Sequence, residues 1–182
     1  MVVIAISGLP CVGTTTVGKL VARKLGLGFF SPGAYFKQHF RAEKEIDRAL
    51  GFLRTGGSEK EFHVKLDKMQ LDVAKAGDVV IAGKLSIYIL KDLADLKVWL
   101  KADLNTRVKR LCERDELAIK EAKSKLKERE SLERELWKSI YGIDYVEQES
   151  MADVVIDTSK KTPAQVAAQI IRNLKSKKKV KA

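Results

Sequence analysis

The chain has 182 residues, which is enough for one ordinary domain and too short for a two-domain enzyme of about 300 residues. Its 45% of hydrophobic and 32% of charged residues, with only three prolines, exclude a disordered or collagen-like chain. The 35 lysines and arginines outnumber the 24 aspartates and glutamates, giving a net charge of +11. We therefore expect an anionic partner such as a nucleotide, a nucleic acid or an acidic membrane surface.

Four apolar runs predict buried strands, at residues 2–7, 78–82, 96–100 and 153–157. None of them alternates apolar with polar residues, which is typical of parallel strands that are covered on both faces. A segment with helical spacing follows each run. This alternation predicts an α/β fold with a parallel sheet.

Start and stop signals place the helices between these strands. We expect helices over Thr14–Leu25, from Ser31-Pro32, from the capping-box spacing of Ser58 and Glu61 to Gly77, and from Thr162-Pro163 onward. The highly charged residues 104–140 predict two helices with a projecting, solvated corner near Asp115. Residues 175–182 hold five lysines and predict a frayed basic tail, which is the only part through which we expect nucleic acid to bind.

The two cysteines, Cys11 and Cys112, are too few for a disulfide framework and favour a reducing, intracellular setting. The first seven residues carry no basic leader and form too short a run for a signal peptide or a membrane span. We therefore expect a cytoplasmic protein with no membrane partner. Cys11 precedes a helix N-terminus, where a thiolate would be stabilised, although a small residue that fills a turn is the simpler interpretation.

A glycine-containing loop joins the first predicted strand to the first predicted helix. The G-x-x-x-x-G spacing of Gly8 and Gly13 lets successive N–H groups point inward, and the helix adds the positive end of its dipole. The residues that would form this phosphate cradle are Gly8, Leu9, Pro10, Cys11, Val12, Gly13, Thr14, Thr15 and Thr16. The hydroxyl of Thr15 would reach Mg²⁺ or its waters. A tight turn without a ligand remains the alternative.

The lysine that usually follows the second glycine of such a loop is Thr14 here, so arginines elsewhere would supply the lost charge. Arg107, Arg110 and Arg114 are spaced by three and four residues, which predicts that all three share one helical face. That face would clamp phosphate. A solvated helix surface is the alternative in so basic a chain.

With these motifs the chain resembles the archaeal-type cytidylate kinases, a branch of the P-loop nucleoside monophosphate kinases, from Val2 to about Leu174. The matching segments are Ile6–Pro10 with Gly13–Thr16, Ser31-x-Gly33-x-x-Phe36, Asp67-x-x-Gln70, Ala94–Leu100, Arg107-x-x-Arg110-x-x-x-Arg114, Arg129-Glu130, Tyr141–Asp144 and Val155–Ser159. The resemblance implies a P-loop NTPase-type parallel β-sheet flanked by helices. It also implies one kinase domain over residues 1–174, with an acceptor-binding segment near 31–76 and a lid near 104–140, acting as a monomer.

The activity implied by the resemblance is transfer of a phosphoryl group from ATP, with Mg²⁺, to CMP or dCMP. Its catalytic groups would be the lid arginines Arg107, Arg110 and Arg114. The acceptor nucleotide would meet Ser31, Lys37, Asp67, Lys84, Arg129 and Glu133. From the residues alone, Ser31 is equally a helix N-cap, and Arg129 with Glu133 is equally a surface ion pair of residues four apart.

Some residues depart from the family's pattern. Its Phe-Arg pair is Phe36-Lys37 here, the arginine of its Glu-Gly-Arg-Leu segment is Lys84, and an aspartate expected four residues before Asp67 is His63. Lysine neutralises phosphate but cannot bind it bidentately, which weakens the case for a cytidine-specific acceptor site. A kinase for AMP or UMP therefore remains an alternative, as does a nucleotide-binding or RNA-binding relative with weak or no turnover.

Overall fold

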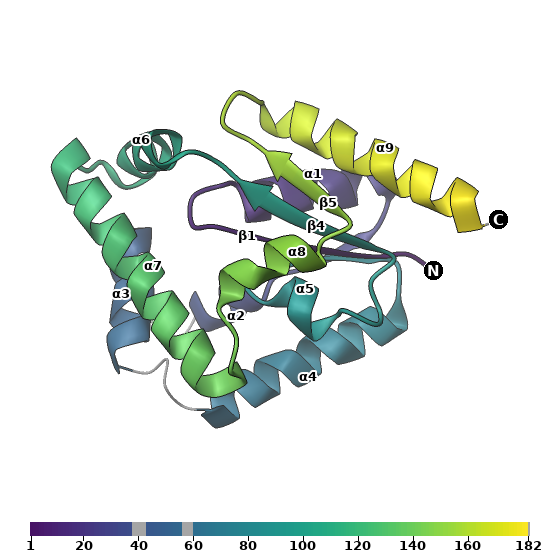
Figure 1. Cartoon of the computed structure of the whole chain (residues 1–182), viewed down its shortest axis with the longest axis horizontal. Helices are drawn as coiled ribbons and strands as arrows, with labels where there is room; N and C mark the ends of the chain where they lie inside the picture. Colours follow the sequence, from purple (N-terminus) through teal and green to yellow (C-terminus); the bar gives the residue numbers. More distant parts are fainter. Residues whose placement is uncertain (38–42, 56–59, 182) are drawn as a thin grey trace.

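The computed structural model describes residues 1–37, 43–55 and 60–181, with the side chains of 35–37, 55 and 178–181 outside that description (Figure 1). Its sheet has five parallel strands in the order β2-β3-β1-β4-β5. The strands are β1 (Val3–Gly8), β2 (Gly28–Phe30), β3 (Val79–Ala82), β4 (Leu96–Lys101) and β5 (Val154–Asp157). The four predicted strands are confirmed, and β2 is an additional edge strand.

Strand β1 lies at the centre of the sheet because its whole length is buried and it pairs with β3 on one side and β4 on the other. All strands run the same way, so the loops that follow them meet at one edge of the sheet. Gly8, the last residue of β1, is in register with Leu100 of β4. The phosphate-loop candidate therefore starts at the middle of this edge.

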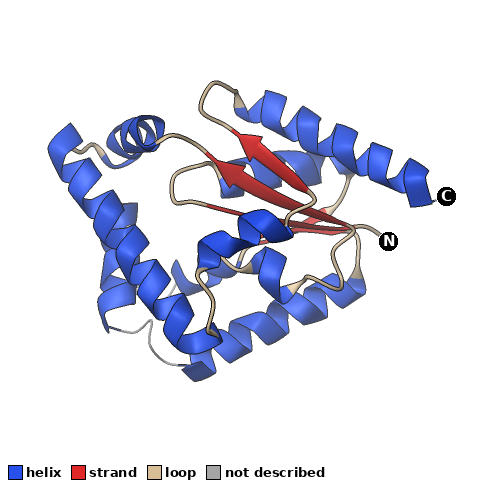
Figure 2. Cartoon of the chain, viewed as in Figure 1, coloured by secondary structure: helices blue, strands red, loops and turns tan. Residues whose placement is uncertain are grey.

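Helices cover both faces of the sheet, as Figure 2 shows. The helices are α1 (Thr14–Leu25), α2 (Pro32–Lys37), α3 (Glu45–Thr55), α4 (Lys60–Ala76), α5 (Ser86–Ile89), α6 (Leu104–Asp115), α7 (Ile119–Tyr141), α8 (Gln148–Met151) and α9 (Pro163–Lys181). A short 3₁₀ turn, η1 (Tyr145–Glu147), precedes α8. Among the described residues, no helix is both long and apolar enough to cross a membrane.

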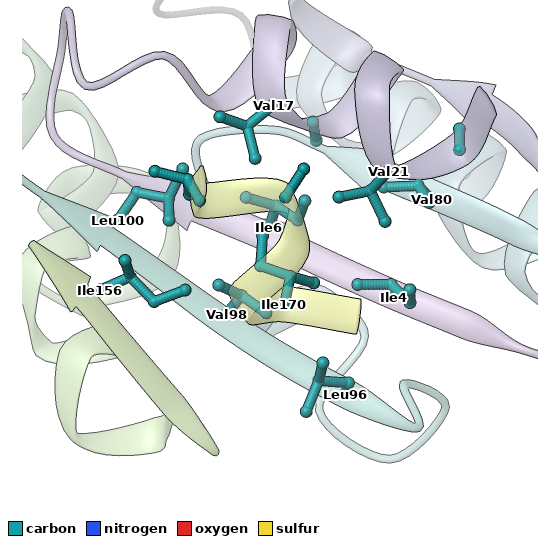
Figure 3. Packing of buried hydrophobic residues seen from close by; sticks show 14 of the residues in the cluster. Ile4, Ile6, Val17, Val21, Val80, Leu96, Val98, Leu100, Ile156 and Ile170 are labelled. Atoms are coloured by element: carbon teal, nitrogen blue, oxygen red, sulfur yellow. The ribbon is translucent and has the colours of Figure 1, made fainter. Parts of the chain in front are cut away.

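Two apolar clusters hold the helices to the sheet. In the first, Val17 and Val21 of α1 and Ile170 of α9 pack on strand residues such as Ile4 and Val98 (Figure 3). In the second, α4, α5 and the end of α7 pack on the other face, around the fully buried Trp99 of β4 and Tyr145 of η1. The β-branched strand residues fill both layers, which explains why the apolar runs do not alternate with polar residues.

A third cluster joins α3 to α6 and α7, and it corrects the expectation of a solvated corner near Asp115. The carboxylate of Asp115 is buried, and its Oδ2 accepts a hydrogen bond from the backbone N–H of Ile46 at 2.8 Å. Ile46 and Leu50 of α3 pack there against Leu111 and Leu126. The prediction of two helices between residues 104 and 140 is confirmed, but their corner packs against α3 rather than projecting into solvent.

The expectation of a frayed tail from residue 175 is also wrong, because α9 continues to Lys181. Lysine is a good helix former, and cations near a helix C-terminus interact favourably with its dipole. The ammonium of Lys177 also lies 2.6 Å from Oδ2 of Asp153, just before β5. This ion pair connects the last turns of α9 to the edge of the sheet.

Candidate active site

A cleft of about 560 Å³ opens at the carboxyl edge of the sheet, a volume in the range of small-molecule sites. The residues predicted from sequence that line it are Gly8, Leu9, Pro10, Cys11, Val12, Gly13, Thr14, Thr15, Thr16, Ser31, Asp67, Lys84, Arg110, Arg114, Arg129 and Glu133. Two predicted site residues are not among them. Arg107 lies elsewhere, and the side chain of Lys37 is outside the described part of the chain.

The loop after β1 is built from backbone geometry. A Cβ on Gly8 would lie 2.3 Å from the carbonyl oxygen of Leu100, so only glycine fits where the loop leaves the strand. Gly13 has a φ of 94°, in the left-handed region that favours glycine, and α1 begins directly after it. The first turn of α1 contains no acidic residue, which leaves the positive end of its dipole available to an anion.

Thr15 lies in this first turn, is exposed and lines the cleft. Its hydroxyl is therefore open to a ligand on the side where the loop would hold phosphates. An oxygen ligand of this kind, with phosphate oxygens and water as the remaining ligands, suits the preference of Mg²⁺. The residues present thus fit a loop that binds phosphate together with Mg²⁺.

Two arginines of α6 stand beside the loop. Arg110 donates from Nη2 to the carbonyl oxygen of Thr158 at 2.7 Å and from Nη1 to its hydroxyl at 3.0 Å, which fixes the guanidinium between the phosphate loop and the loop after β5. Arg114 donates from Nε to Oδ1 of Asp115 at 2.7 Å, and its Nη1 lies 3.1 Å from the carboxylate of Glu45. The cleft therefore has cationic side chains near the position where the usual lysine is missing.

Arg107 does not join them, so the prediction that all three arginines face the cleft is wrong for this residue. Its side chain is buried, pairs with Glu130 of α7, and donates from Nε to the carbonyl oxygen of Ala102 at 3.2 Å. Position 107 is on the same helical face as 110 and 114 but lies nearer the start of α6, where its guanidinium meets Glu130 of α7. Its guanidinium helps to join α6 to α7.

Lys84, Glu133 and Arg129 form a buried charge cluster next to the start of the loop. The ammonium of Lys84 lies 3.0 Å from Oε2 of Glu133, and Nε of Arg129 donates to Oε1 of the same residue at 2.9 Å. Lys84 also donates to the carbonyl oxygen of Gly8 at 3.2 Å and stands over the ring of Tyr145. With only 16% and 6% of their side chains exposed, Arg129 and Glu133 are not the surface ion pair of the alternative interpretation.

Burial and opposite charge compete in setting the pKa values of this cluster. Burial opposes ionisation of Glu133, but the charges of Lys84 and Arg129 hold the pKa of its carboxyl below the ordinary value. Burial lowers the pKa of Lys84, and Glu133 acts in the opposite direction. One carboxylate thus faces two cations, and the excess positive charge suits a phosphate group.

Asp67 occupies the same wall of the cleft, on α4. Its Oδ2 accepts a hydrogen bond from the hydroxyl of Tyr141, the last residue of α7. Burial raises the pKa of Asp67, and the hydrogen bond from Tyr141 lowers it. Gln70 and Trp137 line the cleft as well. Sequence reasoning assigned no role to Tyr141 or Trp137, although they follow Arg129 and Glu133 at a repeating step of four residues, which is the signal that could have found them.

Cys11 and Ser31 line the cleft, and the sequence left two interpretations open for each. Burial raises the pKa of the Cys11 thiol, which disfavours a thiolate and supports the simpler interpretation of a small residue that fills the turn. The carbonyl oxygen of Ser31 accepts from the N–H of Ala34 at 3.0 Å in the first turn of α2. Because Ser31 lines the cleft, contact between its hydroxyl and the acceptor stays a prediction.

A model of the cytidylate kinase-like family matches residues 3–160. The chain belongs to this family. The cytidylate kinase of Pyrobaculum aerophilum is 40% identical over 159 residues, covering 87% of this chain and 85% of its own. That of Pyrococcus horikoshii is 37% identical and covers 91% of this chain and 84% of its own. The cytidylate kinase of Methanopyrus kandleri is 34% identical over 168 residues.

Solved structures show that this member of the cytidylate kinase-like family has the fold of small P-loop kinases. Shikimate kinase from Bacteroides thetaiotaomicron superposes with a TM-score of 0.61 at 19% identity, covering 96% of each chain. An uncharacterized protein from Eubacterium ventriosum superposes with a TM-score of 0.72 at 17% identity, covering 97% of this chain and 99% of its own. The predicted fold class is confirmed.

Proposed function

We propose that the protein transfers the terminal phosphoryl group of ATP to CMP, and to dCMP, forming ADP with CDP or dCDP. The observation that supports the proposal is the cleft itself, whose lining combines a glycine loop of the phosphate-binding type with a buried cationic cluster in a member of the cytidylate kinase-like family. The curated relatives that match most of the chain are cytidylate kinases. One side of the cleft suits the donor nucleotide and the other suits an acceptor monophosphate.

Phosphoryl transfer requires alignment of donor and acceptor and neutralisation of the charge on the transferred group. The loop from Gly8 to Thr16 binds the donor phosphates through its N–H groups. Arg110 and Arg114 supply positive charge beside the loop and compensate for the threonine that replaces the usual lysine. Arg107 acts in this account by holding α6 against α7.

Mg²⁺ would be held by the hydroxyl of Thr15 together with donor phosphate oxygens. When bound, this cation neutralises phosphate charge and fixes the orientation of the donor phosphates.

The acceptor monophosphate occupies the wall formed by α4 and α7. Arg129 and Lys84 attract its phosphate, and Ser31 and Asp67 contact the nucleoside. Residues 31–76 act as the acceptor-binding segment and residues 104–140 as the lid. Because Lys84 is a point charge rather than a forked guanidinium, acceptor binding weakens with salt more than it would with two bidentate arginines.

The direct test is to incubate the protein with ATP, Mg²⁺ and CMP and to measure every nucleotide product. We expect ADP and CDP in equal amounts, and ADP with dCDP when dCMP is the acceptor. Formation of ADP without CDP would identify an ATPase instead of a transferase. Absence of any turnover, with salt-sensitive binding of RNA, would support the nucleic-acid-binding alternative.

A further inference from the structure

A chain of hydrogen bonds runs along the wall of the cleft that α4 and α7 form, from α7 through α4 to α5. The hydroxyl of Tyr141 donates to Oδ2 of Asp67 at 2.5 Å. Nε2 of Gln70 lies 3.4 Å from Oδ1 of Asp67, and the hydroxyl of Ser86 donates to Oε1 of Gln70 at 2.8 Å. Asp67, Gln70 and Tyr141 line the cleft, while Ser86 is completely buried behind them. Side chains from three helices thus set the orientation of two polar groups that a ligand can reach.

The partners at each end of this chain fix which atoms donate and which accept. The hydroxyl of Ser86 donates to the amide oxygen of Gln70, so the amide NH₂ is turned toward Asp67 and the cleft. The reverse orientation would place the amide oxygen of Gln70 against the Asp67 carboxylate, and two acceptors repel each other. The hydroxyl of Tyr141 donates to Asp67 and favours its ionised form, which only accepts. The wall therefore presents one fixed donor, Gln70, beside one fixed acceptor, Asp67.

Helix α7 sets the distance of this pair from the cationic cluster. Arg129, Glu133, Trp137 and Tyr141 follow one another at steps of four residues, and all of them line the cleft. A rise of 1.5 Å per residue places Tyr141 about 12 Å along the helix axis from Glu133. The ammonium of Lys84 reaches both Glu133 and the phosphate loop, so the cationic end is the phosphate end. A nucleotide whose phosphate lay there would extend its base along α7 toward Tyr141 and Asp67.

We infer that Tyr141 is a positioning residue which, with Ser86, fixes the hydrogen-bond polarity of Asp67 and Gln70 so that this pair selects cytosine over uracil; the inference rests on the proposed function. Cytosine offers an amino donor at position 4 and an acceptor at N3. Asp67 accepts from the amino group, and Gln70 donates to N3. Uracil offers a carbonyl oxygen at position 4 and an N–H at N3. The carbonyl oxygen of uracil would meet the Asp67 carboxylate, and its N–H would meet the NH₂ group of Gln70. Both contacts leave buried polar groups without a hydrogen bond, which is costly.

The charge state of Asp67 gives the inference a measurable signature. Burial raises the pKa of Asp67, and the hydrogen bond from Tyr141 of α7 lowers it. The ring of Tyr88, from α5, faces Tyr141 with a centroid separation of 6.1 Å, and His63 lies one turn earlier than Asp67 on α4. Removal of the Tyr141 hydroxyl therefore raises the pKa of Asp67. Once protonated, Asp67 can donate as well as accept, and the discrimination against uracil weakens.

The test is the change Tyr141→Phe, with kcat/KM measured for CMP and for UMP across a pH series with ATP and Mg²⁺. We expect the ratio of the CMP value to the UMP value to fall roughly tenfold, the effect of one discriminating hydrogen bond, and the acid limb of the CMP profile to move to higher pH. Tyr88→Phe is the matched control, because it removes a hydroxyl from a neighbouring ring that does not line the cleft. The control should leave both the ratio and the profile unchanged.

If Tyr141→Phe lowers kcat/KM equally for CMP and UMP and leaves the pH profile unchanged, the inference is overturned and Tyr141 has only a structural role. If Tyr141→Phe does not fold, Asp67→Asn tests the same point, because it replaces one acceptor oxygen by a donor with little change of shape. The ratio of kcat/KM for CMP to that for UMP should also fall in this variant. An unchanged ratio would refute the inference. The proposed function fails separately, if the unmodified protein transfers phosphate to neither nucleotide. A protein that prefers CMP and keeps this preference in both variants refutes the inference alone.

Discussion

The two sides of the cleft differ in what gives them their shape, which is backbone conformation on one side and side-chain charge on the other. The loop between β1 and α1 is shaped by its backbone, through the contact of Gly8 with the carbonyl oxygen of Leu100 and the left-handed conformation of Gly13. The helical wall, which α3, α4, α6 and α7 form around the rest of the cleft, depends on side chains. Ion pairs there join segments distant in sequence, such as Lys125 with Asp47 and Lys84 with Glu133.

This difference predicts which substitutions the site should tolerate. A phosphate cradle made of N–H groups and a helix dipole keeps its function when one cationic side chain is lost, provided that other cations lie nearby. A wall made of buried charges does not tolerate the loss of one member, because the remaining charges are left unpaired in a poorly solvated place. The predictions below change one side of the cleft at a time.

The largest effect is expected from Glu133→Ala, which leaves Lys84 and Arg129 without their shared carboxylate. The free energy of unfolding should fall by about 4 kcal/mol, as is typical when one partner of a buried pair is removed. Glu121→Ala is the control, because Glu121 pairs with Lys125 at the same i,i+4 spacing on α7 but is 46% exposed. This change should lower the free energy of unfolding by less than about 1 kcal/mol. Denaturant unfolding measures both, and equal costs would contradict the buried-cluster account.

The same residue predicts a pH dependence. The pKa of Glu133 is held below its ordinary value, so its contribution to stability is complete at neutral pH and is lost as the pH falls through the lowered pKa. The unmodified protein should therefore lose more stability than Glu133→Ala between neutral pH and about pH 3. Parallel stability curves for the two proteins would show that Glu133 is not the titrating group.

A slightly smaller effect is expected on the backbone side, from Gly8→Ala. The new methyl group would stand 2.3 Å from the backbone oxygen of Leu100, and a strand in the middle of a sheet cannot shift to relieve it, so we expect a loss of about 3 kcal/mol. Gly51→Ala is the control, since a Cβ there meets nothing within 4 Å inside α3. That change should stabilise by up to about 1 kcal/mol. A melting curve of Gly8→Ala that matches the unmodified protein would refute the close-contact argument.

The cations beside the loop should affect catalysis more than stability. Replacing Arg110 or Arg114 by alanine should lower kcat by roughly 100-fold, which corresponds to about 2.7 kcal/mol of lost transition-state stabilisation. Lys19→Ala serves as the comparison, because Lys19 is exposed and its ammonium stands 5.9 Å from the ring centre of Phe29. Steady-state kinetics measures all three variants. Small and similar changes of kcat in all three variants would show that the arginines of α6 take no part in catalysis.

The smallest effect is expected where the ion pairs of the helical wall reach solvent. Arg54 and Glu128 pair with 56% and 38% of their side chains exposed. Arg54→Ala should lower the free energy of unfolding by less than about 1 kcal/mol, and salt should reduce even this difference. Unfolding at low and high salt measures it, and a large, salt-insensitive loss would mean that the pair is not screened by solvent.

The sequence predicted the backbone side of the cleft well and the helical wall poorly. Continuous apolar runs and the spacing of Gly8 and Gly13 are local signals, and they predicted four strands, α1 and the loop. Strand β2 was missed because three residues beginning with Gly28 form no apolar run. Helix α3 was missed although Ile46, Leu50 and Leu53 recur at helical steps.

Long-range partners account for the other misses. Nothing near Arg107 in the sequence indicates that Glu130 pairs with it, and nothing near Asp115 indicates that α3 covers it. Likewise the hydrogen bond from Tyr141 to Asp67 joins residues 74 positions apart. Such pairings follow from the packing of α6 and α7 on the rest of the molecule, which spacing along the chain does not encode.

The measurement that tests the account most directly is kcat/KM for CMP, dCMP, UMP and AMP, with ATP and Mg²⁺, at two salt concentrations. The account predicts that CMP and dCMP are preferred and UMP is strongly rejected, because uracil leaves the polar groups of Asp67 and Gln70 unpaired. All values should fall as salt rises, since we propose that Lys84 attracts the acceptor phosphate as a point charge. A clear preference for AMP or UMP, or transfer to none of the four, would contradict it.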